Sequence, residues 1–286
     1  MSLGRILTAI VTPFDADGNV DEAAFVALHQ HVVRLGSDGI VACGTTGEAS
    51  TLAVDEHLRV IGLAVSEKPP GTTVIAGTGS NDTRHAVEMT ERATALGVDG
   101  ILSVTPYYNK PPRRGLIAHY RAIAAATDRP IVLYNIPSRT ALDMPNDLLA
   151  ELAQIEGIEA VKQANPANLA PIDGLRIYAG NDDMLADVLD MGEPGGVLTA
   201  SHLVGDRMRA MVDADPAERR RIEDGLRPLY EALGRHQAAI ALKEALELLG
   251  IRAGRPRLPY VPLDDAERAE LRGALERHGL LEPARS

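Results

Sequence analysis

Short apolar segments rich in β-branched residues recur along the chain, and most are followed by a stretch with helical periodicity. A strand this short and this apolar is typical of a parallel sheet, in which both faces are covered. Eight alternating strand and helix units predict an α/β fold, a closed (β/α)8 TIM barrel. The apolar segments are Ile6–Thr12, Gly39–Gly44, Thr73–Gly79, Gly100–Pro106, Pro130–Ile136, Ile158–Gln163, Arg176–Asn181 and Gly195–Ala200.

Helical patterns fill the gaps between these segments, for example Asp21–Leu35, Asp55–Ser66, Asp82–Leu96 and Arg114–Thr127. Several of them start at an Asp that can cap a helix. A doubly wound sheet is the competing fold, but it would carry a glycine-rich phosphate loop after the first strand. That segment ends instead in Thr12-Pro13-Phe14, which favours the barrel.

The pattern becomes entirely helical from about Val204. Its helical stretches are Pro216–Leu233, Arg235–Leu249 and Asp264–His278. We therefore expect residues 1–203 to form the barrel and residues 204–286 to form a C-terminal helical extension packed on it.

Charge and composition limit the partners and the location of the chain. A net charge of −11 argues against nucleic acid and against an anionic membrane surface. No apolar run approaches the roughly 20 residues of a spanning helix, and the N-terminus does not resemble a signal peptide. A single cysteine, Cys43, excludes an internal disulfide and a Cys-rich zinc site. We expect a cytoplasmic protein.

Lys162 is one of only four lysines and lies inside the sixth apolar segment. A lysine in a buried strand usually reaches the rim or pairs with a carboxylate. In a barrel, however, an inward lysine points to the catalytic end. There its neutral amine could attack a carbonyl and form an imine that acts as an electron sink. The other three lysines, Lys68, Lys110 and Lys243, are expected to be solvated.

Polar residues also end the neighbouring strands. Tyr134 in the fifth segment could be core packing or could transfer protons. Arg139, just after it, suits a carboxylate. Thr45 and Thr46 lie in a G-T-T-G-E segment that is either a turn or part of a site. Tyr107 and Tyr108, adjacent aromatics in a loop, indicate a pocket or a subunit interface.

Together, the segments G-T-T-G-E, T-P-Y-Y-N and Y-N-I-P-S-R-T and the lysine of the sixth strand resemble the pyruvate-dependent class I aldolase family of dihydrodipicolinate synthase and N-acetylneuraminate lyase. The resemblance runs from about Leu7 to the C-terminal helices. It implies a (β/α)8 barrel, a covalent imine between pyruvate and Lys162 with no separate cofactor or metal, and a homotetramer built as a dimer of dimers.

The resemblance also assigns roles to single residues. Lys162 would form the imine, and Thr45, Tyr134 and Tyr108 would relay protons, Tyr108 within the site of a neighbouring subunit. Thr46 would hold the pyruvate carboxylate and Arg139 that of L-aspartate 4-semialdehyde. Backbone at Gly195-Gly196-Val197 would border the pocket, with Val197 as the expected contact and Leu198 as the alternative. The synthase branch joins these two substrates in lysine and diaminopimelate biosynthesis.

Three other functions remain open at this point. A 2-keto-3-deoxy sugar acid aldolase or an N-acetylneuraminate lyase would share Lys162 and Tyr134, although Arg139 and Thr46 favour the synthase. A metal-dependent barrel aldolase needs clustered ligands, whereas the histidines are scattered. A non-catalytic binding protein on the same fold would be expected to lose Lys162 or Tyr134.

Two departures from the family pattern bear on regulation and on the surroundings of the site. Gln163 stands where many members have Glu or Asp after the lysine. The positions that bind lysine in lysine-inhibited members correspond to a set that includes apolar residues and lacks an acidic one at residue 85. We therefore expect feedback inhibition by lysine to be weak or absent. The corresponding positions are Ala49, Val54, His57, Asn81, His85 and Tyr107.

Overall fold

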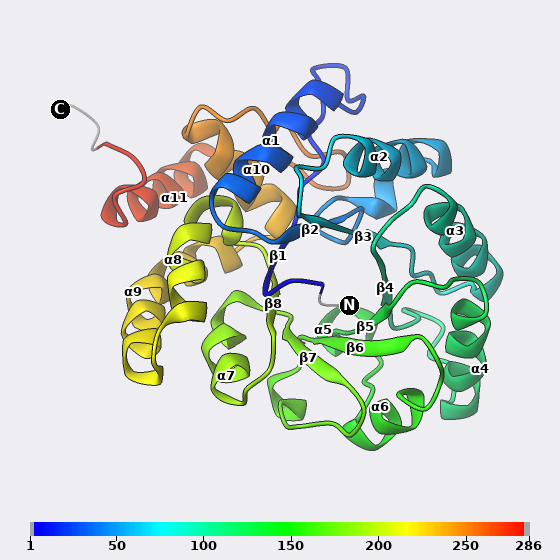
Figure 1. The fold of residues 1–286 in the computed structure, drawn as a ribbon. Coiled ribbons are helices and arrows are strands. Elements are labelled where there is room, and N and C mark those ends of the chain that lie inside the picture. Colours follow the sequence, from blue (N-terminus) through cyan, green and yellow to red (C-terminus); the bar gives the residue numbers. More distant parts are fainter. Residues whose placement is uncertain (1–2, 283–286) are drawn as a thin grey trace.

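Eight parallel strands close into a barrel, each pairing with the next along the chain and β8 pairing with β1 (Figure 1). The computed structural model describes residues 3–282. The predicted (β/α)8 barrel is confirmed, and every strand falls within its predicted segment. The strands are β1 (Ile6–Ala9), β2 (Gly39–Ala42), β3 (Thr73–Gly77), β4 (Gly100–Val104), β5 (Ile131–Asn135), β6 (Ile158–Gln163), β7 (Arg176–Ala179) and β8 (Gly195–Leu198).

The helices outside the barrel include the four expected ones, with Asp21 and Asp82 as caps whose side chains accept hydrogen bonds from the backbone. These helices are α1 (Glu22–Arg34), α2 (Val54–Ser66), α3 (Thr83–Ala95) and α4 (Arg113–Ala124). Three shorter helices had no clear periodic pattern: α5 (Pro137–Thr140), α6 (Asn146–Leu152) and α7 (Leu185–Asp190).

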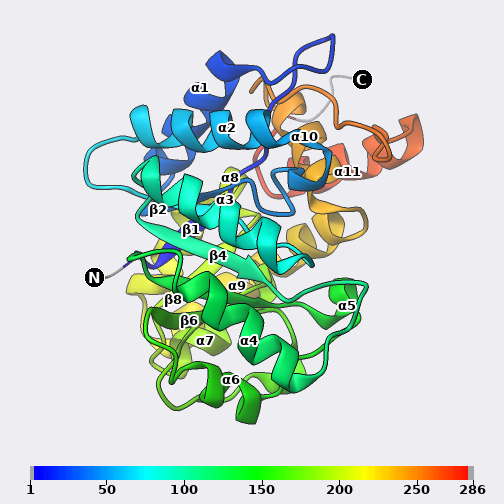
Figure 2. The ribbon, with the colours of Figure 1, turned by 90° about the vertical axis from the view of Figure 1, so that its right-hand side faces the viewer.

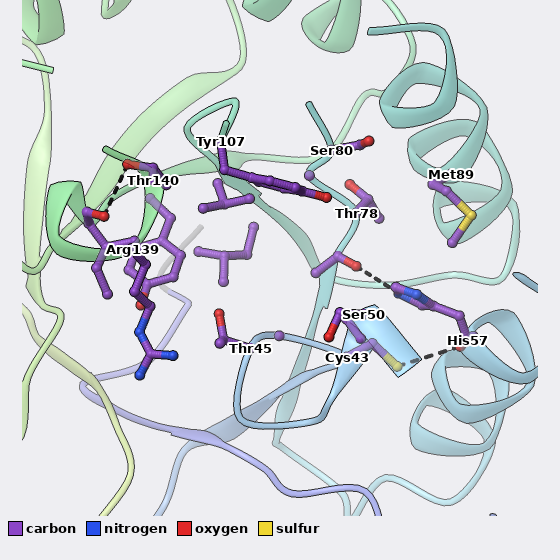
Figure 3. A pocket seen from close by; sticks show the side chains of 18 of the residues that line it. Cys43, Thr45, Ser50, His57, Thr78, Ser80, Met89, Tyr107, Arg139 and Thr140 are labelled. Carbon is purple, nitrogen blue, oxygen red and sulfur yellow. Dashed lines mark hydrogen bonds between the residues drawn. The ribbon is translucent and has the colours of Figure 1, made fainter. Parts of the chain in front are cut away.

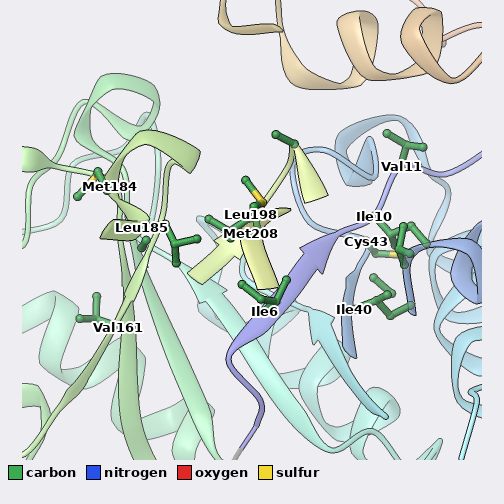
Figure 4. Packing of buried hydrophobic residues seen from close by; sticks show 14 of the residues in the cluster. Ile6, Ile10, Val11, Ile40, Cys43, Val161, Met184, Leu185, Leu198 and Met208 are labelled. Carbon is green, nitrogen blue, oxygen red and sulfur yellow. The ribbon is translucent and has the colours of Figure 1, made fainter. Parts of the chain in front are cut away.

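The core has two layers because successive residues of a strand point to opposite faces. One cluster fills the barrel and includes Leu7, Val132, Tyr134 and Val197. The other packs between the strands and the helices and includes Ile6, Ile40, Val161 and Leu198 of the strands and Leu185 and Met208 of the helices (Figure 4). The interior of the barrel is thus packed, which leaves its carboxyl end as the place for a site.

The C-terminal part is helical, as expected. Helix α8 (Ser201–Asp213) packs on β1 and α1, and Val204 interrupts it with φ −132°. It is followed by α9 (Pro216–Gly234), α10 (Ala238–Leu248) and α11 (Asp265–Arg277), which pack on one another. Helix α8 spans the position 203/204 at which we divide the barrel from the extension, and that division stays a prediction.

The two ends of the barrel differ. In Figure 2 the strand β4 points away from the N-terminus, toward the end where α5, α10 and α11 lie. The carboxyl ends of the strands therefore face the helical extension. Within residues 3–282, no helix combines the length and the hydropathy needed to cross a bilayer.

Candidate active site

Lys162 lies near the carboxyl end of β6, inside the barrel. Its register partners are Tyr134 of β5 and Tyr178 of β7. The Nζ atom lies 4.2 Å from the centroid of the Tyr134 ring, and only 5% of the residue is exposed. Among residues 3–282, no carboxylate oxygen comes within the 4.0 Å of a salt bridge to this atom. The geometry offers an amine to a bound carbonyl without a competing ion pair.

Two cavities open at this end of the barrel and share a wall. The Lys162 cavity has a volume of about 530 Å³. The second, which we call the His57 cavity, has a volume of about 550 Å³ and is lined by His57, His85 and Tyr107; Figure 3 shows His57 and Tyr107 in it. Thr45, Tyr134, Ile136 and Arg139 line both. The hydroxyls of Thr45 and Tyr134 therefore stand where protons could pass between the imine site and the second cavity.

Arg139 is held at the rim by the four-residue helix α5, which follows β5 directly and ends at Ala141 with φ +56°. Its side chain is exposed at the shared wall and forms no ion pair with any residue from 3 to 282. In Figure 3 its guanidinium group extends toward Thr45. Thr46, which is buried, lines the Lys162 cavity. Together these groups suit a substrate that carries both a carbonyl and a carboxylate.

Asp182 and Tyr230 also line the Lys162 cavity and were not identified from the sequence. Asp182 follows β7 and accepts hydrogen bonds from Thr199 N (2.8 Å), Thr199 Oγ1 (2.5 Å) and Ala200 N (3.0 Å). Burial raises the pKa of Asp182, while these hydrogen bonds and the charge of Lys162 act in the opposite direction. Burial also raises the pKa of the Tyr230 hydroxyl. The sequence signal that could have identified Asp182 is its position just after a strand.

Tyr108 and Val197 do not line either cavity within this chain. Tyr108 is 88% exposed and adopts φ +73°, which leaves its hydroxyl on the outer surface. Val197 packs in the interior of the barrel, and the alternative, Leu198, packs outside it. The roles assigned to these residues stay predictions.

The environment of Lys243 differs from the one expected for it. It is 1% exposed and paired with buried Glu48, so the interpretation as a solvated lysine is wrong. Lys68 is partly exposed and paired with Asp99. In the described part of the chain, no three or more His, Cys, Asp or Glu side chains are grouped so that they could hold a metal ion.

Comparison with known proteins agrees with this geometry. The model of the dihydrodipicolinate synthetase family matches residues 2–278. The chain belongs to this family. A family relative, the 4-hydroxy-tetrahydrodipicolinate synthase of Synechococcus sp. (strain WH7803), is 48% identical over 284 residues, which cover 95% of this chain and 94% of the relative.

Solved structures of the dihydrodipicolinate synthetase family share the fold over nearly their whole length. The enzyme from Cyanidioschyzon merolae, solved with lysine bound, superposes with a TM-score of 0.92 at 38% identity and covers 98% of this chain and 99% of its own. The chloride-inhibited enzyme from Acinetobacter baumannii, solved with pyruvate, gives a TM-score of 0.93 at 35% identity and covers 98% and 100%.

Proposed function

We propose that the chain is a lyase that condenses pyruvate with L-aspartate 4-semialdehyde to 4-hydroxy-tetrahydrodipicolinate, in lysine and diaminopimelate biosynthesis. The observation that carries the proposal is Lys162: a buried amine without a carboxylate partner, in a cavity it shares with Thr46, Tyr134 and Arg139. The relatives named above support the choice of substrates.

The first half of the reaction makes a nucleophile. The neutral amine of Lys162 attacks C2 of pyruvate, and loss of water leaves an imine whose cationic nitrogen withdraws electrons from C3. Thr46 holds the carboxylate of pyruvate. Tyr134 and Thr45, placed in the wall between the two cavities, carry the protons that the carbinolamine gains and loses. Loss of a C3 proton then gives the enamine.

The second half joins the substrates. Arg139 binds the carboxylate of L-aspartate 4-semialdehyde and directs its aldehyde to the enamine. A C–C bond forms between C3 of pyruvate and the aldehyde carbon, and the aldehyde oxygen takes up a proton. The substrate's own amine then attacks C2, closes the ring and releases Lys162. One water is lost overall, and no separate cofactor takes part.

Assembly and location belong to the same proposal. Tyr108 projects from the surface of its own chain, so the relay is completed by Tyr108 from a neighbouring copy. We infer a homotetramer formed by two dimers, located in the cytoplasm.

The decisive experiment is reduction with borohydride in the presence of pyruvate, followed by peptide mass spectrometry. We expect one pyruvate-derived adduct per chain, on Lys162. Lys110→Arg is the matched control, because Lys110 is exposed and lines neither cavity, so its replacement should leave the adduct unchanged. An adduct on another lysine, or none, would overturn the imine mechanism.

A coupled assay then separates the members of the family. The protein with its imine intact should turn over L-aspartate 4-semialdehyde, while 2-keto-3-deoxy sugar acids and N-acetylneuraminate should be cleaved poorly. Faster turnover of a sugar acid would assign the chain to the lyase branch.

A further inference from the structure

The carboxylate of Asp143 is surrounded by side-chain amides instead of cations. Its Oδ1 atom accepts hydrogen bonds from Nδ2 of Asn135 (2.9 Å), Asn165 (3.1 Å) and Asn168 (3.0 Å), and Asn168 also reaches Oδ2 (2.9 Å). Across residues 3–282, no Lys, Arg or His forms an ion pair with it. Burial by itself would raise the pKa of Asp143, but the hydrogen bonds lower it below its usual value. The surrounding amides therefore stabilise the carboxylate of Asp143, which has no ion-pair partner among the described residues.

The amides around Asp143 come from β5, which carries Tyr134, and from the segment that follows β6, which carries Lys162. Asn135 directly follows Tyr134, and it pairs in register with Gln163, which follows Lys162. Asn135 Nδ2 also donates to Gln163 Oε1 (3.1 Å), and this oxygen accepts from Asn165 N (3.0 Å). Because alternate residues of a strand face opposite sides, Asn135 and Gln163 point outward while Tyr134 and Lys162 point inward. The amide cluster therefore lies behind the barrel wall that bears the site.

Asp143 and Met144 connect this cluster to the segment that carries Arg139. Helix α5 is too short to be stable alone, since it has four residues. Beyond this helix the chain returns to β5 at Met144. Met144 N donates a hydrogen bond to Asn135 Oδ1 (3.1 Å), and Asn135 Nδ2 donates one to Met144 O (3.2 Å). The segment from 137 to 144 is thus fixed at one end by β5 and at the other by the Asn135 and Asp143 contacts. The backbone that carries Arg139 is therefore held from both sides.

We propose that Asp143 is a positioning residue that sets the specificity of the second half-reaction: it holds the Arg139 segment against the strands of Lys162 and Tyr134, so that Arg139 meets the carboxylate of the aldehyde substrate. This inference rests on the proposed function. Its consequence is selective, because the proposed function assigns the carboxylate of the aldehyde substrate to Arg139 and that of pyruvate to Thr46. Loss of Asp143 weakens the use of the aldehyde and spares the imine.

The test compares Asp143→Asn with Asp147→Asn. Asp143→Asn removes the charge and directs an amide at other amides. Asp147→Asn is the matched control, since Asp147 is 69% exposed and pairs with Arg113 on the outer surface. For each variant we would measure the KM of each substrate, kcat, the yield of the borohydride adduct with pyruvate, and the thermal midpoint. We expect Asp143→Asn to raise the KM of L-aspartate 4-semialdehyde about tenfold, as for loss of a charge-assisted contact. The KM of pyruvate and the adduct yield should not change.

A second variant keeps the inference testable if Asp143→Asn fails to fold. Asn168 lies at the surface side of the cluster, and Asn168→Ala removes two contacts to Asp143. We expect this variant to raise the KM of the aldehyde as well, but by less. Equal rises in both KM values, or a lower thermal midpoint with unchanged kinetics, would overturn the positioning role. Wild-type protein that forms the adduct but does not turn over L-aspartate 4-semialdehyde would instead refute the proposed function.

Discussion

The Nζ atom of Lys243 lies 2.6 Å from Oε1 of Glu48, and both side chains are fully buried. Glu48 ends the segment that carries Thr45 and Thr46, with φ +56°. Its other oxygen accepts a hydrogen bond from Arg257 N (2.9 Å). Phe14 contacts both cations, with Lys243 Nζ 4.0 Å and Arg257 Cζ 4.2 Å from the ring centroid. A buried ion pair therefore joins the helical extension to the threonine segment of the site.

Breaking this pair should destabilise the protein strongly. Lys243→Met leaves Glu48 buried and uncompensated, which we expect to lower the free energy of unfolding by about 3–5 kcal/mol. The double variant Lys243→Met with Glu48→Gln removes both charges and should recover most of the loss. Urea unfolding measures each value. The control Lys68→Met breaks a partly exposed pair with Asp99 and should cost about 1 kcal/mol or less. A single variant as stable as the wild type would contradict the role of the pair.

Three buried histidines should make the fold sensitive to acid. Burial lowers the pKa of His29, His119 and His202 to about 4, whereas the pKa of a histidine in the unfolded chain is about 6.5. The unfolded chain therefore takes up these protons first. Stability should be complete above that pH and fall toward about pH 4, by about 1.4 kcal/mol per pH unit for each histidine.

His29 allows a direct check, because neither ring nitrogen has a hydrogen-bond partner among the described residues. His29→Leu should reduce the slope of stability against pH across this window, as measured by urea unfolding at several pH values. An unchanged slope would show that His29 does not contribute.

Tyr108 offers a test of assembly. Tyr108→Phe should reduce turnover sharply and leave the thermal midpoint unchanged, because it removes only a hydroxyl that has no hydrogen-bond partner among residues 3–282 of its own chain. Mixing this variant with Lys162→Ala under conditions of subunit exchange should restore part of the activity. The restored sites would combine Lys162 of one chain with Tyr108 of the other. Normal activity of Tyr108→Phe, or no recovery in the mixture, would refute a relay between subunits.

Lysine should inhibit the protein weakly or not at all. Of the expected positions, Ala49, His57, His85 and Tyr107 line the His57 cavity, and no described residue that lines it is Asp or Glu. The ammonium group of lysine would therefore find no carboxylate there. Initial rates across a lysine titration measure this, and a sub-millimolar inhibition constant would contradict the prediction. His85→Glu should introduce or strengthen inhibition.

Much of the barrel could be read from the sequence because its strands are apolar on both faces. The short helices α6 and α7 could not be predicted, since their seven and six residues give too few turns for a periodic pattern. Lys162 could be identified because a charged side chain within such a strand can reach water only at an end of the barrel. Lys243 could not, because its partner Glu48 is distant along the chain and its own helix has charged neighbours. Contacts that join remote segments leave no local pattern.

The amide cluster shows the same limit. Gln163 was noticed as a departure from the family pattern, but its orientation required the structure. Asp143, Asn165 and Asn168 lie in connecting segments, where polar residues are common and suggest nothing specific. Only the register of β5 and β6 brings them together.

The Lys162 cavity takes part of its wall from the extension, where Tyr230, Leu233, Ala238 and Leu242 belong to α9 and α10. The chemical groups, by contrast, stand on the strands and the segments that follow them directly. An engineer could therefore randomise these helical positions to admit other aldehydes while the amine of Lys162 and the hydroxyls of Thr45 and Tyr134 stay in place. Carbon–carbon bond formation could be redirected from a part of the chain that contributes no strand.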